Sequence, residues 1–91
     1  MKTTDPGQSL LVFPCRFPVK AMGRQGEDFQ RIVSGIILAR ARLMEGEALR
    51  FTPSKNNNYV SITAVIEAES QQQLDAIYRD LSACEQVLMA L

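Results

Sequence analysis

The sequence predicts one α+β domain whose strands and helices follow the order βαββαβ. Three observations favour this order. Apolar residues alternate with other residues along 16–22 and 59–68, as in half-buried strands. Apolar residues recur every three or four positions along 27–42 and again after Ser70, as on one face of a helix. Between the two helical stretches, a run of turn-forming residues at 53–58 indicates a hairpin.

The composition is that of an ordinary folded chain. The 91 residues are long enough for one core, and 46% of them are hydrophobic and 22% charged, which argues against disorder. We place the domain at residues 15–91, after an N-terminal arm of residues 1–14. Ten basic and ten acidic residues give a formal net charge of zero, so we expect neither nucleic acid nor membrane as a partner.

The chemistry of metal and acid–base sites is poorly represented in the chain. It contains no histidine, and its two cysteines, Cys15 and Cys84, lie too far apart in the sequence for a CxxC site. We therefore expect no metal, no cofactor and no catalytic residue. No stretch is long and apolar enough for a transmembrane helix, and residues 1–6 do not resemble a signal peptide, so we expect a cytoplasmic location.

The first strand is predicted at residues 16–22, where Phe17, Val19 and Ala21 face the core. Pro18 removes one hydrogen-bond donor from this strand. Gly23 and Gly26 mark a short loop after it.

The first helix is predicted from Glu27 to about Arg42. Acidic residues begin it, and Arg40 and Arg42 end it, which complements the helix dipole. Gly35, inside the helix, costs about 0.5–1 kcal/mol relative to alanine. Leu38 lies opposite the apolar stripe and is either a lone exposed leucine or an anchor of a subunit contact. The stripe consists of Phe29, Ile32, Val33, Ile36 and Ile37.

Two strands at 47–52 and 59–68 form the predicted hairpin. Three asparagines at 56–58 mark its turn, because asparagine tolerates the positive φ that hairpin turns require. Ser70 and Gln73 then form a capping box that opens the second helix. This helix buries Leu74, Ile77, Tyr78 and Leu81, and has Cys84 at its edge.

A last strand at 86–91 completes a ferredoxin-like βαββαβ sandwich. Right-handed crossovers then give a four-stranded antiparallel sheet in the order 4-1-3-2, with both helices on one face.

Three blocks of sequence carry a family resemblance. They are Phe13–Gly23, Pro53–Lys55 with Tyr59–Thr63, and Ala68–Leu81 followed by Val87–Leu91. In this order they span residues 10–91 and resemble the YbeD-like family of small, uncharacterised bacterial proteins. The resemblance implies a fold close to ACT domains, which bind small molecules and regulate enzymes. It also implies a regulatory tie to lipoate metabolism, because the family's genes tend to neighbour an octanoyltransferase gene. It carries over no catalytic residue.

Two candidate sites follow. Similarity to ACT domains implies an effector site in the loop after the first strand, at Met22, Gly23, Arg24, Gln25 and Gly26. Glu27 and Asp28 beside this loop either favour an amine-bearing or neutral ligand or serve the helix dipole alone.

The second candidate is the sheet face without helices. It is either an ordinary solvated face or a surface for a protein partner or a second copy. The short outer strands also offer edges for a homodimer. The alternation places on this face Lys20, Met22, Ala48, Arg50, Ser61, Thr63, Val65 and Glu67, with Leu88 or Met89 from the last strand.

The sequence thus predicts a non-enzymatic regulatory or protein-interaction domain of ACT type, whose partner is an unknown protein or small molecule. Two alternatives have less support. An acylphosphatase-like hydrolase would bind phosphate at residues 23–26, but acidic Glu27 and Asp28 oppose it and no asparagine lies within a strand. An RNA-binding module needs aromatic side chains on the open faces of both central strands, where this chain offers Tyr59.

Overall fold

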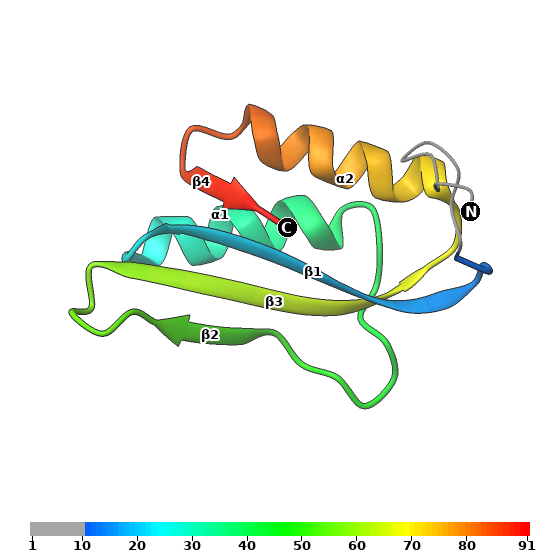
Figure 1. Ribbon diagram of the computed structural model, residues 1–91, viewed down its shortest axis with the longest axis horizontal. Coiled ribbons are helices and arrows are strands. Elements are labelled where there is room, and N and C mark those ends of the chain that lie inside the picture. Colours follow the sequence, from blue (N-terminus) through cyan, green and yellow to red (C-terminus); the bar gives the residue numbers. More distant parts are fainter. Residues whose placement is uncertain (1–10) are drawn as a thin grey trace, which may run out of the picture.

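The computed structural model describes residues 11–91 (Figure 1). The four strands form one sheet in the order β2-β3-β1-β4, and neighbouring strands are antiparallel. The predicted βαββαβ order and the 4-1-3-2 sheet are therefore confirmed. The elements in chain order are β1 (Cys15–Arg24), α1 (Glu27–Leu38), β2 (Arg50–Pro53), β3 (Tyr59–Ala68), α2 (Gln71–Ala83) and β4 (Val87–Ala90).

The core lies between the sheet and the two helices, which cover the same face (Figure 1). The central strands β1 and β3 pair along their whole length, from Cys15 opposite Ala68 to Arg24 opposite Tyr59. Odd-numbered residues of β1 and even-numbered residues of β3 face the helices, so the other side chains of both strands lie on an open face. The helices contribute Phe29, Val33, Ile37, Leu74, Ile77 and Leu81 to the core.

β1 is longer than predicted and continues through Gly23 to Arg24. A Cβ atom at Gly23 would overlap the backbone oxygen of Gln86 and the ring of Phe29. Glycine is therefore required here by close packing inside the strand, and not by a loop as the sequence suggested. The connection from β1 to α1 consists of the next two residues, Gln25 and Gly26.

α1 ends at Leu38, so its predicted extension to Arg42 is wrong. Arg40 is instead attached to the second helix. Its Nε atom lies 2.6 Å from Oδ2 of Asp80, and its carbonyl oxygen accepts a hydrogen bond of 2.9 Å from Nε2 of Gln73. The last turn of α1 contains no basic residue, so the predicted pairing of arginines with the helix dipole is also wrong.

β2 begins at Arg50, three residues later than predicted. The chain before it still lies beside β3, because Leu43 forms an isolated bridge with Ile66. Gly46 then turns the chain with a φ of 85°. This turn interrupts the pairing with β3, which resumes at β2. β4 is likewise shorter than predicted, by one residue at each end.

The hairpin turn and the start of α2 are as predicted. Asn57 adopts the left-handed conformation with a φ of 65°. The Ser70 hydroxyl accepts a hydrogen bond of 3.0 Å from the backbone N–H of Gln73. In return, Oε1 of Gln73 accepts one of 2.7 Å from the backbone N–H of Glu69.

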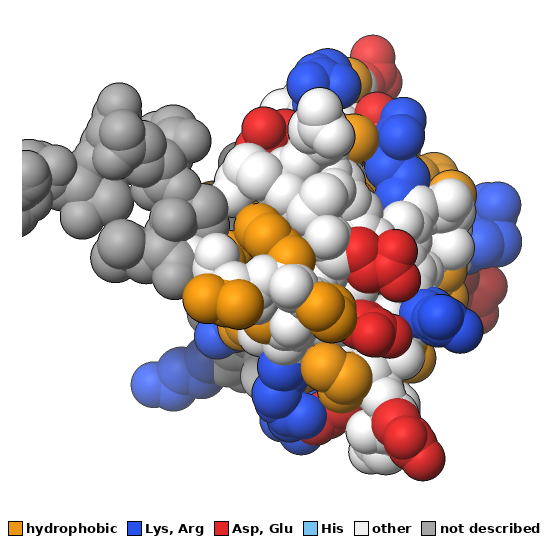
Figure 2. Space-filling view, turned by 90° about the vertical axis from the view of Figure 1, so that its right-hand side faces the viewer, with side chains coloured by type: hydrophobic (Ala, Val, Ile, Leu, Met, Phe, Trp, Pro, Cys, Tyr) orange, Lys and Arg blue, Asp and Glu red, His pale blue; other side chains and the backbone are white. Residues whose placement is uncertain are grey.

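Figure 2 shows the end of the molecule where β1 and α2 begin, and hydrophobic side chains gather there with charged side chains around them. Residues 1–10 of the predicted N-terminal arm lie outside the described residues. Of the rest of the arm, Phe13 packs against the core, whereas Val12 is 80% exposed. Neither α1 nor α2 is long and apolar enough to cross a membrane.

We expect Gly23→Ala to lower the free energy of unfolding by about 1–3 kcal/mol, because the methyl group overpacks the contact with Phe29. The matched control is Gly35→Ala. Gly35 is exposed in α1 with open space around it, so alanine there raises the free energy by about 0.5–1 kcal/mol. Urea unfolding followed by circular dichroism measures both changes. Equal stability of the two variants would contradict the packing role of Gly23.

Candidate functional site

One row of side chains crosses the open face of the sheet. Its members lie opposite one another in the strand register, from β4 through β1 and β3 to β2: Met89, Met22, Ser61 and Thr52. Met22 and Met89 are 37% and 50% exposed. A shift of register in β4 leaves Leu88 without a counterpart in β1, and this side chain is exposed as well. The row is therefore apolar at the β4 side and carries the hydroxyl groups of Ser61 and Thr52 at the β2 side.

A second row runs parallel to the first. Lys20 in β1 lies opposite Thr63 in β3, which lies opposite Arg50 in β2. At the other edge, Leu91 extends the row through two backbone hydrogen bonds with Lys20, of 3.1 and 2.8 Å. Leu91 is 67% exposed, so it adds to the apolar surface formed by Met22 and Met89.

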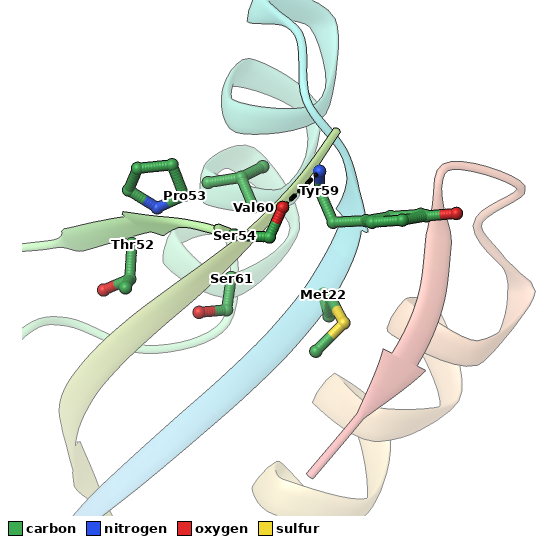
Figure 3. A pocket seen from close by; sticks show the side chains of 7 residues that line it. All are labelled: Met22, Thr52, Pro53, Ser54, Tyr59, Val60 and Ser61. Carbon is green, nitrogen blue, oxygen red and sulfur yellow. Dashed lines mark hydrogen bonds between the residues drawn. The ribbon is translucent and has the colours of Figure 1, made fainter. Parts of the chain in front are cut away.

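Two shallow depressions share Met22 and Ser61 as lining residues. The larger, of about 220 Å³, extends toward β2 and the hairpin turn and includes Tyr59 (Figure 3). In Figure 3 the side chains of Met22, Thr52 and Ser61 point to the same side of the sheet. The smaller, of about 160 Å³, extends toward β4 and is lined also by Lys20, Ala21, Met89 and Leu91. The open face is the whole side of the sheet that the helices leave uncovered, and these rows and depressions lie on it.

The acidic side chains at the open face are engaged in ion pairs. Glu47 reaches over the face, where it pairs with Arg16 and lies 3.5 Å from Arg50. Its side chain is only 11% exposed. Glu67 lies 3.8 Å from Arg42. These pairs occupy both carboxylates in the part of the face near the beginning of β1.

Two basic side chains of the open face differ from the others. Among the described residues, no carboxylate lies within ion-pair distance of Lys20 or Arg24. The Arg24 guanidinium lies over the ring of Tyr59, 6.0 Å from its centroid, which is a cation–π distance. Lys20 lines the smaller depression. The apolar part of the face is thus flanked by two cations that form no ion pair among the described residues.

Most of the predicted partner face lies where the sequence placed it, with two corrections. Ala48 precedes β2 and lies outside the strand register. Val65 points to this side of the sheet but is only 9% exposed, so it contributes almost no surface.

The structure divides the predicted effector loop, because Arg24, Gln25 and Gly26 line one hollow whereas Met22 and Gly23 lie outside it. Met22 and Arg24 project from β1 onto the open face, Gly23 faces the core, and the turn follows. The turn is attached to the hairpin, because the Gln25 N–H donates to the Asn58 carbonyl at 2.9 Å. A separate hollow of about 410 Å³ lies at the start of α1, and its lining includes Arg24, Gln25, Gly26, Glu27, Asp28 and Phe29.

Metal-ligating groups are sparse throughout residues 11–91. This part of the chain holds no group of three or more histidine, cysteine, aspartate and glutamate side chains that could bind a metal ion. Cys15 and Cys84 are free thiols and half-buried, and Cys15 packs against the core.

Tyr78 fixes the end of β4, a role that the sequence gave no signal for. Its hydroxyl donates a hydrogen bond of 2.5 Å from α2 to the Leu91 carbonyl oxygen. The same oxygen accepts the Lys20 N–H. Burial raises the pKa of the Tyr78 phenol above its usual value of 10. Since β4 supplies Met89, this hydrogen bond helps to set the apolar side of the open face.

Sequences similar to this chain include bacterial proteins of the UPF0250 group. A family profile described as "Protein of unknown function (DUF493)" matches residues 8–91. A UPF0250 protein of Bordetella parapertussis is 32% identical over 91 residues, which is 100% of both chains. A UPF0250 protein of Neisseria meningitidis is 36% identical over 83 residues, covering 91% of each chain.

Two solved structures have a similar fold. Protein HP0495 from H. pylori matches with a TM-score of 0.68 and 15% identity, covering 100% of this chain and 96% of that one. The C-terminal domain of the MgtC protein from Mycobacterium tuberculosis matches with a TM-score of 0.63 and 15% identity, covering 90% and 89%. At such low identity the likeness shows the fold alone.

The raised pKa of Tyr78 predicts how stability changes at alkaline pH. The folded state holds the phenolic proton more tightly than the unfolded chain, so this contribution is complete below pH 10 and is lost as the pH rises through the folded-state pKa. Tyr59→Phe leaves Tyr78 as the single tyrosine. Its tyrosinate absorbance should then have a midpoint above that of the same variant in urea. Equal midpoints would contradict the burial of the phenol.

Proposed function

The chain belongs to the DUF493 family of small bacterial proteins, as the YbeD-like resemblance indicates, and we propose that it is a non-enzymatic interaction domain that binds a protein on its open face. The observation that carries this proposal is the continuous apolar surface of Met22, Met89 and Leu91. Large exposed apolar patches bordered by polar side chains are typical of interaction surfaces.

The shape of the open face supports a protein as the ligand. Its two depressions are shallow and lie side by side along the sheet, and they share Met22 between them. Small-molecule sites are usually deeper and enclose most of their ligand. Methionine side chains are flexible and polarizable, so Met22 and Met89 suit a surface that adapts to the side chains of a partner.

The absence of enzymatic activity is part of the proposal. At the open face, the carboxylates of Glu47 and Glu67 are held by arginines and are poorly placed to act as acid or base. An acylphosphatase-like site would need the hollow at the start of α1 to accept phosphate. Glu27 and Asp28 line that hollow together with one arginine, Arg24, so two carboxylates face a single cation there. Arg31 of α1 lies 3.0 Å from Asp28 and is held by it.

RNA binding and small-molecule sensing have less support than protein binding. RNA recognition on such a sheet uses several stacking aromatic side chains. The open face offers the Tyr59 ring, and Arg24 already covers it. An ACT-type effector site would need residues 22–26 to converge on one ligand. Only Arg24, Gln25 and Gly26 line the hollow at the start of α1, whereas Met22 lies on the open face and Gly23 is buried in β1.

The proposal extends to the role of the interaction, which is to regulate lipoate metabolism in the cytoplasm. The family resemblance is its support. It makes an enzyme of lipoate metabolism the first partner to look for, and the experiment below identifies the partner without assuming it.

Site-specific photo-crosslinking in bacterial cells tests the proposed function. A photoreactive amino acid at Thr52, an exposed member of the first row, should give a protein adduct that mass spectrometry identifies. The matched control carries the same amino acid at Gln72, which is exposed on α2. Adding Met22→Ser should weaken formation of the Thr52 adduct about tenfold, since burial of a methionine contributes about 1.5 kcal/mol. The proposal fails if Gln72 gives the same adduct or if Met22→Ser leaves it unchanged.

A further inference from the structure

We propose that the partner presents an acidic and apolar segment to the open face, in which bulky apolar side chains enter the depressions beside Met22 and flanking carboxylates pair with Lys20 and Arg24. This inference rests on the proposed function and names the chemistry of the partner. Its two supports are the order of side chains along β1 and the distribution of charge across the face.

The order of side chains along β1 is cation, apolar, cation. Lys20, Met22 and Arg24 all lie on the open face because they occupy alternate positions of one strand. Alternate Cα atoms of an antiparallel strand are about 7 Å apart, so the Cα atoms of Lys20 and Arg24 lie about 14 Å from each other with Met22 between them. A complementary segment therefore has the order acid, apolar, acid.

The charges of the open face are not balanced. Four basic side chains from the strands lie on it, namely Arg16, Lys20, Arg24 and Arg50. The carboxylates that reach it belong to Glu47 and Glu67, which pair with arginines, and Lys20 and Arg24 form no ion pair among residues 11–91. Glu27 and Asp28 share with Arg24 the hollow at the start of α1 and not the depressions of the open face. The unbalanced charge is thus positive and lies beside the apolar surface, where complementary potential guides association.

The smaller depression combines both features in one place. Met22, Met89 and Leu91 form its apolar walls, and Lys20 stands at its border. An aliphatic side chain of the partner fits the walls, and a carboxylate on a neighbouring residue reaches the ammonium group. Arg24 and Tyr59 play the corresponding parts beside the larger depression, where the guanidinium lies over the ring.

A second copy of the chain is a poorer occupant for the same reasons. Stacking two open faces about a twofold axis at Met22 would bring Lys20 and Arg24 of one copy toward the same two cations of the other, and like charges across an interface oppose association. Edge pairing is also restricted. β2 and β4 are short, with four residues each. Pro53 at the end of β2 offers no N–H group, and the irregular pairing of β4 with β1 disturbs the backbone at the other edge.

Selection from a display library of random dodecapeptides tests the inference. The wild-type protein should enrich peptides in which Asp or Glu flank Leu, Ile, Met or Phe. The double variant Lys20→Glu/Arg24→Glu should instead enrich Lys and Arg around the same apolar residues. Lys55→Glu is the matched control, because Lys55 is exposed in the hairpin turn, and it should enrich the wild-type pattern.

Fluorescence anisotropy with the most enriched acidic peptide gives the magnitude. Lys20→Gln should raise its Kd about fivefold, as expected for the loss of one exposed ion pair, whereas Lys55→Gln should not change it. The difference in Kd between Lys20→Gln and the wild-type protein should shrink as the salt concentration is raised. Thermal unfolding checks that the variants remain folded, which their exposed positions favour.

The outcomes separate the two proposals. If the wild-type protein enriches peptides without an acidic preference, and Met22→Ser/Met89→Ser abolishes this enrichment, the charge inference is overturned and the open face remains the docking surface. Enrichment that survives these substitutions overturns the proposed function itself. The acidic segment is overturned as the occupant by any of three results. The wild-type protein enriches no peptide, two copies dimerise through the open face, or single-stranded RNA competes with the peptide for the open face.

Discussion

The antiparallel pairing of β1 with β3 is the constraint on which the rest of the structure depends. The two strands pair over ten positions and form the centre of the sheet. Because side chains alternate between faces, this register decides which residues enter the core and which reach solvent. A slip of β1 by one residue against β3 would turn the side chains of β1 to the other face, which would expose Val19 and bury Lys20. The complete burial of Val19 and Ile62 therefore fixes the composition of the open face as firmly as that of the core.

The apolar part of the open face depends on a shorter and less paired strand. β4 contributes Met89 from only four residues, and its register with β1 shifts next to Gly23. Two contacts hold it in place. The missing side chain of Gly23 admits the backbone of Gln86, and the Tyr78 hydroxyl binds the carbonyl at the other end. The apolar part of the open face is thus linked to packing on the opposite side of the sheet.

The fold and much of the open face follow from periodicity in the sequence. β3 has the predicted bounds, Asn57 takes the positive φ that the turn requires, and Ser70 caps α2. Lys20 and Thr63 lie on the open face because strict alternation leaves them no other side. These features are local, since each depends on residues within one turn or a few positions along one strand.

Contacts between distant residues decided what the sequence could not. α1 stops at Leu38, and the chain after it is attached to α2 through Arg40 and Asp80, which are 40 positions apart. The pair of Arg16 and Glu47, 31 positions apart, neutralises one part of the open face. The sequence by itself determined the order of the elements and the faces of the central strands, because local periodicity encodes them. Only the tertiary structure decided which charges remain unpaired, because that depends on which side chains the fold brings together.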